Sequence, residues 1–362
     1  MSKRIGILWN TIEKYTFDRK VQYFDYAGDN LGNLVYLEGL HKLLGSNVTH
    51  VPWHSPAKYV EENFDALVLP AANQLGSHTD LGSIAELWES YNVPIIVLGL
   101  GIQSVGEKII LSEGTQNWLR VLVDSSIKFD NPIGVRGSAS NKLILEHYPY
   151  ANLKITGCPS VAIGIANSDL GKQLNNNKNK NLRKILLNSG DLSWKGTLAD
   201  HKRYIYEVIL NNGAYVIQAP RELYDILNDP ENPKNIPYIE EFNNKFNLEA
   251  NGINPYSFFA EYGKYFYSVE DWMTLCRNYD YCVGFRIHGY LVSTYSGVPS
   301  LLTIVDSRTK ELSETLGLLT VNFDENKSLE QIKQKIVDFN YDEMLDKWEF
   351  NLAEINKIIK NI

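Results

Sequence analysis

The stretch Val283–Ile304, "VGFRIHGYLVSTYSGVPSLLTI", decides the fold. An apolar run ends at Arg286 and His288, a helix-like pattern follows over 289–297, and a second apolar run begins at 299. Strand, helix and strand in this order form a βαβ unit, whose two strands run parallel. The junction carries Arg and His where a turn residue is expected. Because a helix N-terminus offers free backbone N–H groups and the positive end of its dipole, this junction is suited to hold an anion.

The same alternation of strands and helices extends over both halves of the chain. In the first half we expect strands at 5–9, 64–69, 93–98, 133–137 and 153–157, and helices at 31–45, 80–91, 113–126 and 138–148. In the second half we expect strands at 184–188, 214–218, 264–267, 281–287 and 299–305, and helices at 198–211, 269–279, 289–297 and 308–317. The pattern predicts an α/β fold with two parallel sheets facing a cleft, in which ligands bind beyond the carboxyl ends of the strands.

The domain organisation follows from length and from one polar segment. With 362 residues the chain exceeds the usual size of one domain. Residues 167–183 are rich in Asn and Lys, which is typical of an exposed linker. We therefore predict a Rossmann-like domain over 1–166, a linker over 167–183 and a second Rossmann-like domain over 184–327. The tail 328–362 has the pattern of two amphipathic helices, whose apolar stripe needs a partner, and we expect it to bridge back to the first domain.

The composition excludes several kinds of partner. Asp and Glu number 43 against 35 Lys and Arg, and this net charge of -8 argues against nucleic acid or an anionic membrane as a partner. No apolar run approaches the ~18 residues of a membrane span, so we expect no transmembrane segment and a cytoplasmic location. The three Cys form no CxxC pair and the seven His show no metal-site spacing, so we expect no metal and no cofactor.

Arg286 and His288 are the main candidates for catalysis. In a strand their side chains would point to the same face, because the period is two, and would project together into the cleft. Arg286 could bind an anion as a planar fork, and His288 could move protons near neutral pH. The alternative is that Arg286 pairs with a carboxylate and His288 packs under the helix. Arg136, in "IGVRGSAS" (133–140), repeats the geometry of strand end, Arg and helix start.

Two further segments are candidates for substrate binding. In "AGDNLGNL" (27–34), Gly and Asn can adopt positive φ, so the backbone near Asp29 and Asn30 could approach a ligand closely. Asp29 could instead cap the following helix. The backbone N–H groups near Gly289, at the start of the helix that follows His288, are the second candidate.

The loop 11–26, "TIEKYTFDRKVQYFDY", is longer than the usual connection between a strand and a helix. By the strand-end rule it lies at the cleft. Its aromatic residues Tyr15, Phe17 and Tyr23 are predicted to bind the apolar faces of a sugar. The alternative is that these rings only pack the loop against the domain, since aromatic side chains mostly serve burial.

Taken together, these motifs resemble the polysaccharide pyruvyl transferase family. The matching features are "GDNLGN", "LGLGIQ", "IGVRGSAS", "ITGCPSVA", "GFRIHG" and "SGVPSLLTIVDSRTKEL", in the family's order over most of residues 25–317. Two departures are visible. The chain has "PAANQLGSHTD" (70–80) where the family often has a Gly-rich element, and Gly137 where an acidic residue usually follows "VR".

The resemblance implies a glycosyltransferase-B-like fold and transfer of pyruvate from phosphoenolpyruvate to a sugar, with formation of a cyclic ketal. Arg136 matches the family's first-domain Arg, and Arg286 and His288 match its second-domain Arg and His. The implied partners are phosphoenolpyruvate as donor and a hexose acceptor, lipid-linked or polymeric, in capsule or exopolysaccharide biosynthesis, with peripheral association to a polysaccharide-assembly complex.

Two other functions are compatible with the same sequence. A nucleotide-sugar glycosyltransferase of this architecture would also place Arg or Lys on phosphates, and it would need a ribose-binding Glu, for which Glu311 is the candidate. A non-catalytic anion-binding assembly protein would bind without turnover. Stabilisation by phosphoenolpyruvate, as opposed to nucleotide diphosphates, discriminates the first two functions.

Overall fold

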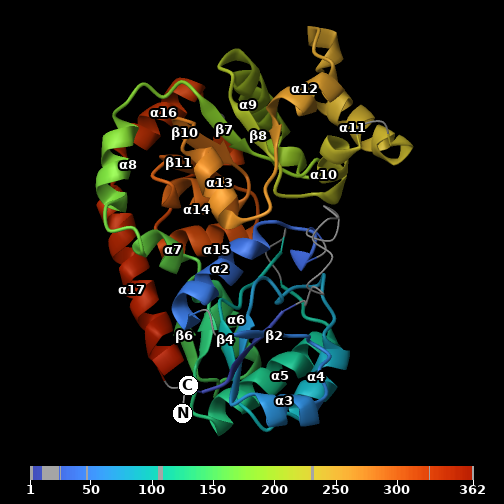
Figure 1. Cartoon of the computed structure of the whole chain (residues 1–362), viewed down its shortest axis with the longest axis vertical. Helices are drawn as coiled ribbons and strands as arrows, with labels where there is room; N and C mark the ends of the chain where they lie inside the picture. The colour runs from blue at the N-terminus through green and yellow to red at the C-terminus, as the bar shows by residue number, and fades with distance from the viewer. Residues whose placement is uncertain are drawn as a thin grey trace.

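The computed structural model describes residues 3–9, 24, 26–45, 48–104, 109–229, 232–325 and 327–360. It contains two α/β domains, each built on a parallel sheet (Figure 1). The first domain contains β1 Ile5–Leu8, α2 Asn33–Leu44, β2 Thr49–Val51, α3 Ala57–Asn63, β3 Ala66–Pro70, α4 Gly82–Glu89, β4 Ile95–Leu98, α5 Glu113–Lys128, β5 Ile133–Val135, α6 Ser138–His147, β6 Leu153–Ile155 and α7 Val161–Ile165. Helix α8, Leu170–Lys178, follows it.

The second domain is larger and carries the C-terminal helices. It contains β7 Ile185–Asn188, α9 Leu198–Leu210, β8 Ala214–Val216, α10 Arg221–Asn228, α11 Ile236–Phe246, α12 Pro255–Tyr262, β9 Gly263–Lys264, α13 Val269–Cys276, β10 Tyr281–Gly284, α14 Ile287–Tyr295, β11 Ser300–Ile304, α15 Ser307–Leu316, β12 Thr320–Asn322, α16 Leu329–Asp338 and α17 Tyr341–Lys360. The alternation of strands and helices read from the sequence is therefore confirmed in both halves.

The strand orders place a ligand-binding edge in each sheet. The first sheet has the order β2-β1-β3-β4, and β5 and β6 continue beyond β4 through a bridge between Leu100 and Val135. The second has the order β12-β11-β10-β7-β8-β9. Strands β8 and β9 are added on one side of β7 and strands β10 to β12 on the other, so the topological switch point lies between β7 and β10. Open α/β sheets bind ligands beyond the carboxyl ends of the strands at such a point. The segment after β10, which begins the Arg286–His288 motif, lies there.

The central strands are buried on both faces. Every residue of β3, β4, β7 and β10 is buried, including the apolar runs "ALVLP" and "IIVL". Helices cover both faces of a parallel sheet, so its strands carry continuous apolar runs without alternation. This is the reason that these strands were recognisable in the sequence.

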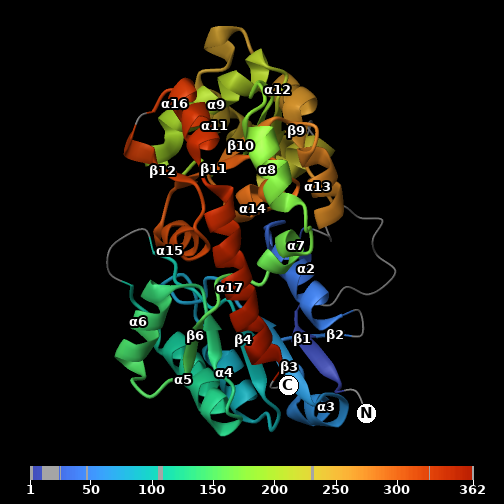
Figure 2. The ribbon, with the colours of Figure 1, turned by 90° about the vertical axis from the view of Figure 1, so that its left-hand side faces the viewer.

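The last helix connects the two domains, as expected. Helix α17 contacts β4, β6 and α7 of the first domain, and α15 of the second. Figure 2 shows it running from the second domain down along the first. Helix α16 instead packs on β11 within the second domain. The two parallel sheets and the bridging helix confirm the expected glycosyltransferase-B-like arrangement.

Three local expectations were wrong. The segment 167–183 is not simply an exposed linker, because it contains α8, whose Leu170 and Leu174 are buried and which packs on α17. Strand β10 ends at Gly284 rather than at residue 287, and helix α14 begins at Ile287. The strand expected at 264–267 is confined to β9 at the edge of the sheet. The domain boundaries themselves stay a prediction.

None of the helices in the described part of the chain combines the length and the apolar character that a membrane span requires.

We expect Trp348→Ala to destabilise the protein strongly. Trp348 is fully buried in α17, its indole N–H donates to the Leu316 carbonyl at 3.0 Å, and its ring meets Tyr295 edge-on at 5.3 Å. Removing a buried Trp side chain should lower the free energy of unfolding by about 3–5 kcal/mol. The matched control is Phe350→Ala on the same helix, because Phe350 is 65% exposed and its loss should cost less than about 0.5 kcal/mol. Equal denaturant midpoints for the two variants would contradict the stabilising role of the buried Trp348.

Candidate functional site

A small cavity lies between the two domains at the carboxyl ends of their strands. Its lining combines polar side chains from the first domain with the Arg286–His288 segment of the second. The lining residues are Asn30, Asn33, Ala72, Asn73, Arg136, Gln218, Arg286, Ile287, His288 and Arg308. The structure thus brings together four of the residues singled out in the sequence: Arg136, Arg286, His288 and Asn30.

Arg286 occupies the junction between β10 and α14. Its backbone is extended and it forms the N-cap of α14, without any side-chain cap on the helix. The side chain is only 7% exposed; Nε donates to the Ser189 carbonyl at 3.1 Å and the guanidinium lies over the Trp194 ring at 5.2 Å. Burial, and then the charge of Arg308, lower the pKa of Arg286 to about 10. The terminal nitrogens have no hydrogen-bond partner within the described residues, so the predicted alternative of a structural Arg–carboxylate pair is not observed.

His288 lies in the first turn of α14 rather than in a strand, yet it lines the same cavity as Arg286. The ring is 6% exposed, its Nε2 is 3.7 Å from Cys158 Sγ, and it packs against Tyr36 with the ring centroids 5.6 Å apart. Burial, followed by the charges of Arg136 and Arg308, holds the pKa of His288 well below its ordinary value. The imidazole is therefore neutral at pH 7 and can accept a proton.

Arg136 reaches the cavity from the first domain. It follows β5, is 2% exposed, and donates from Nε to the Gly99 carbonyl at 2.9 Å. Its aliphatic part packs so closely on Gly101 that a Cβ there would come within 2.5 Å of Arg136 Cδ. Burial is the main cause that lowers its pKa. Arg136 is thus a second desolvated cation at the edge of the same cavity.

The helix that follows Arg136 does not offer the free anion site that the sequence suggested. Glu311 of α15 occupies the N-terminus of α6, where one oxygen accepts from the Ser140 N–H at 2.5 Å and the other from the Ser140 hydroxyl at 2.7 Å. Its side chain crosses Gly137, where a Cβ would lie 2.6 Å from Glu311 Cγ. Burial raises the pKa of Glu311. Both carboxylate oxygens are engaged between the domains, so Glu311 is not free to bind a ribose.

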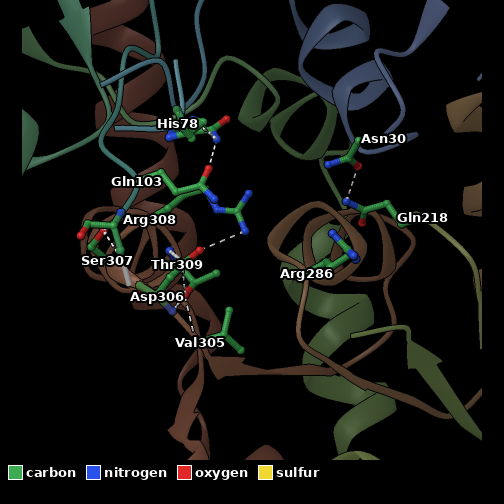
Figure 3. Close-up of polar contacts among 12 residues, drawn as sticks. Asn30, His78, Gln103, Gln218, Arg286, Val305, Asp306, Ser307, Arg308 and Thr309 are labelled. Carbon is green, nitrogen blue, oxygen red and sulfur yellow. Dashed lines mark hydrogen bonds and ion pairs between the residues drawn. The ribbon is translucent and has the colours of Figure 1, made fainter. Parts of the chain in front are cut away.

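A third arginine, Arg308, was missed in the sequence. It lies in the first turn of α15, directly after β11, with a side chain 16% exposed and an ion pair to Asp306 at 3.3 Å (Figure 3). A signal was present, because Arg308 follows β11 closely and lies at the start of the next helix, as Arg286 does after β10. In the sequence, "VDSRTKEL" contributed to the expected helix 308–317 and to the family resemblance, and its Arg was assigned no role.

All the charged side chains among the described residues that line the cavity are cationic. Of the described residues that line it, three are Arg and none is Asp or Glu. Buried charges without compensating partners are costly, and an anionic ligand would offset that cost. In the part of the chain that the structure describes, no group of three His, Cys, Asp or Glu side chains could hold a metal ion.

The "GDNLGN" segment contributes Asn30 but not Asp29. Asn30 Oδ1 accepts from the Gly32 N–H at 3.0 Å and from Gln218 Nε2 of the second domain at 2.8 Å (Figure 3). Asp29 has a positive φ of 58° and pairs with Arg221 across the domains. It neither lines the cavity nor caps α2, whose N-cap is Gly32. The cap interpretation of Asp29 was therefore wrong.

Of the remaining predicted binding residues, Gly289 lies within the described part of the chain and the three aromatic residues do not. Gly289 does not line the cavity; it packs on Asn188, whose Cγ would lie 2.2 Å from a Cβ at position 289. Glycine is required there because any side chain would collide with Asn188. Tyr15, Phe17 and Tyr23 lie outside the described residues, and their role in acceptor binding stays a prediction. The three cysteines are free and buried.

Contacts between the domains keep the cavity narrow. Leu31 donates from its backbone to the Gln218 carbonyl at 3.0 Å on one side, and the Ser307 hydroxyl donates to the Ser104 carbonyl at 3.0 Å on the other. The open space is about 30 Å³, room for about two waters.

Comparison with known proteins gives one family and several distant structures. The family model described as polysaccharide pyruvyl transferase matches residues 10–307. No curated protein sequence matches the chain significantly. The UDP-GlcNAc 2-epimerase of Methanocaldococcus jannaschii, in complex with UDP-GlcNAc and UDP, aligns at a TM-score of 0.45 and 12% identity, over 95% of this chain and 93% of that one. A ugt transferase from Siraitia grosvenorii in complex with UDP aligns at a TM-score of 0.40 and 12% identity, over 99% of both chains.

Proposed function

Because the chain belongs to the polysaccharide pyruvyl transferase family, we propose that it transfers the enolpyruvyl group of phosphoenolpyruvate to two hydroxyls of a hexose. The product is a pyruvate ketal on a bacterial-type surface polysaccharide or its precursor, such as a capsule or exopolysaccharide. The observation that carries the proposal is the cavity in which Arg136, Arg286 and Arg308 meet, without an Asp or Glu among the described lining residues. Phosphoenolpyruvate carries a phosphate and a carboxylate, and Arg forks suit both groups.

The phosphate is assigned to Arg286 and to the N-terminus of α14. Each of the three arginines lies near the N-terminus of a helix: Arg136 near α6, Arg286 near α14 and Arg308 near α15. That of α6 is occupied by Glu311 and that of α15 by the side chain of Asp306, whereas α14 has no side-chain cap. Its free N–H groups and the buried guanidinium of Arg286, whose terminal nitrogens have no hydrogen-bond partner within the described residues, together form the site best suited to a dianion.

The reaction requires several proton transfers close to His288. C3 of the enol gains a proton, which leaves an oxocarbenium-like C2. One acceptor hydroxyl adds to C2 and loses its proton, inorganic phosphate leaves, and the second hydroxyl closes the ring and loses its proton. A neutral His288 can accept a hydroxyl proton and return it as a general acid. The arginines stabilise the charge on the departing phosphate.

The proposal includes the setting of the reaction. Phosphoenolpyruvate is the donor substrate and no cofactor is needed, since the enol phosphate supplies the activated carbon. The acceptor is a free, lipid-linked or polymeric hexose. The donor is made inside cells, so we place the reaction in the cytoplasm, in peripheral association with a polysaccharide-assembly complex.

We expect phosphoenolpyruvate to raise the melting temperature of the protein. A ligand at about 100 times its Kd stabilises the folded state by about 2.7 kcal/mol, and here it would also compensate buried cations. The measurement is thermal unfolding with phosphoenolpyruvate, UDP and UDP-glucose in parallel. Stabilisation by the nucleotides alone would favour the glycosyltransferase alternative. Stabilisation by phosphoenolpyruvate without turnover on any sugar would favour the non-catalytic anion-binding protein.

A further inference from the structure

We infer that Arg308 determines donor specificity by binding the carboxylate of the donor together with Arg136, on the opposite side of the reacting carbon from the phosphate. The inference rests on the proposed function, because it takes phosphoenolpyruvate as the donor. It adds a residue that the sequence motifs did not single out, and it divides the three arginines between the phosphate and the carboxylate of the donor.

The contacts of Arg308 leave it available to a ligand. Asp306 is its one carboxylate partner among the described residues, at 3.3 Å from Nη2. The other oxygen of Asp306 caps α15 by accepting from the Thr309 N–H at 2.8 Å. Arg308 Nε is buried without a hydrogen-bond partner. A buried donor without a partner is costly, so a ligand carboxylate that accepts from it would be favoured.

The charge of Arg308 acts on the three other titratable residues that line the cavity. Its charge lowers the pKa of Arg136, of Arg286 and of His288. All four residues line the same cavity.

The helix termini separate the phosphate from the carboxylate. The N-terminus of α15 is closed by Asp306, so Arg308 acts through its guanidinium alone, without free helix N–H groups beside it. The N-terminus of α14 remains open beside Arg286. A planar guanidinium binds a planar carboxylate through two parallel hydrogen bonds. With the phosphate at Arg286 and the carboxylate at Arg308 and Arg136, C2 and C3 lie between them, in the cavity that His288 also lines.

The test measures binding of phosphoenolpyruvate and of inorganic phosphate by calorimetry. Arg308→Ala should weaken phosphoenolpyruvate roughly tenfold to a hundredfold, the loss expected for a charge-assisted hydrogen bond, and leave phosphate affinity within about twofold. Arg286→Ala should weaken both ligands. Arg308→Lys keeps the charge but loses the planar fork, so it should recover only part of the affinity for phosphoenolpyruvate. This variant also allows the test if the Ala variant fails to fold. Lys310→Ala, exposed on the same helix, is the matched control and should change neither affinity.

Two results would overturn the assignment of Arg308 to the carboxylate, and a third would refute the proposed donor. Equal loss of phosphate and phosphoenolpyruvate affinity in Arg308→Ala would overturn the assignment of Arg308 to the carboxylate. Unchanged phosphoenolpyruvate affinity in that variant would overturn it as well. Failure of the unaltered protein to bind phosphoenolpyruvate would instead refute the proposed donor, and the inference with it.

Discussion

Arg286→Ala is expected to weaken phosphoenolpyruvate binding roughly tenfold to a hundredfold. Its guanidinium is desolvated, its terminal nitrogens have no partner within the described residues, and it stands at the open N-terminus of α14. A lost charge-assisted hydrogen bond costs about 1.5–3 kcal/mol. The variant should stay folded, because the loss of packing on Trp194 is offset by removal of a buried cation that forms no ion pair within the described residues. Kd is measured by calorimetry, with unfolding followed by circular dichroism.

The matched control for Arg286→Ala is Arg277→Ala. Arg277 lies after α13 in the same domain, is exposed, and does not line the cavity. Its removal should leave the Kd for phosphoenolpyruvate within about twofold, as is usual for surface substitutions. Arg136→Ala should behave like Arg286→Ala, with a smaller effect on inorganic phosphate. Unaltered phosphoenolpyruvate affinity in both cavity variants would remove the donor site from this position.

His288→Asn is expected to lower kcat by about 10²–10⁴-fold while the Kd for phosphoenolpyruvate changes little. The imidazole is neutral because burial and the neighbouring arginines lower its pKa, so its contribution is proton transfer rather than charge. Asn retains much of the shape of the ring but cannot take up a proton at this pH. The measurement is single-turnover kinetics with donor and acceptor both saturating.

The control for His288→Asn is His147→Asn, the same substitution at the exposed end of α6. It should leave kcat unchanged. If His288→Asn retained full kcat, the proton-transfer role would be excluded. If it lost donor affinity and kcat in equal proportion, His288 would be a binding residue instead.

The strands and the position of the site could be read from the sequence because both depend on local patterns. β3, β4, β7 and β10 are short apolar runs bounded by Gly, Pro or polar residues, as is typical of a parallel sheet buried on both faces. Arg136, Arg286 and His288 each follow such a run, and the strand-end rule places them at the cleft. His288 belongs to a helix, contrary to the strand pattern, yet one turn of helix keeps it beside Arg286.

What the sequence could not show depends on contacts between distant residues. Glu311 reaches Ser140 across 171 positions of the chain, and no local pattern indicates that this carboxylate fills the N-terminus of α6. Helix α8 has only Leu170 and Leu174 as buried residues, and their burial comes from packing on α17. In the sequence, the many Asn residues of this segment indicate a loop more strongly than two Leu residues indicate a buried helix. The pairing of Asp29 with Arg221 likewise joins the two domains, so a local cap was the only partner that the sequence offered.

The most direct test of the central claim is mass spectrometry of hexose acceptors incubated with the protein and phosphoenolpyruvate. The account predicts that an acceptor gains one pyruvyl unit with loss of water, that one inorganic phosphate is released for each ketal, and that Arg286→Ala and His288→Asn reduce this product. Transfer of a sugar from a nucleotide donor, with no pyruvyl product on any hexose acceptor, would contradict it.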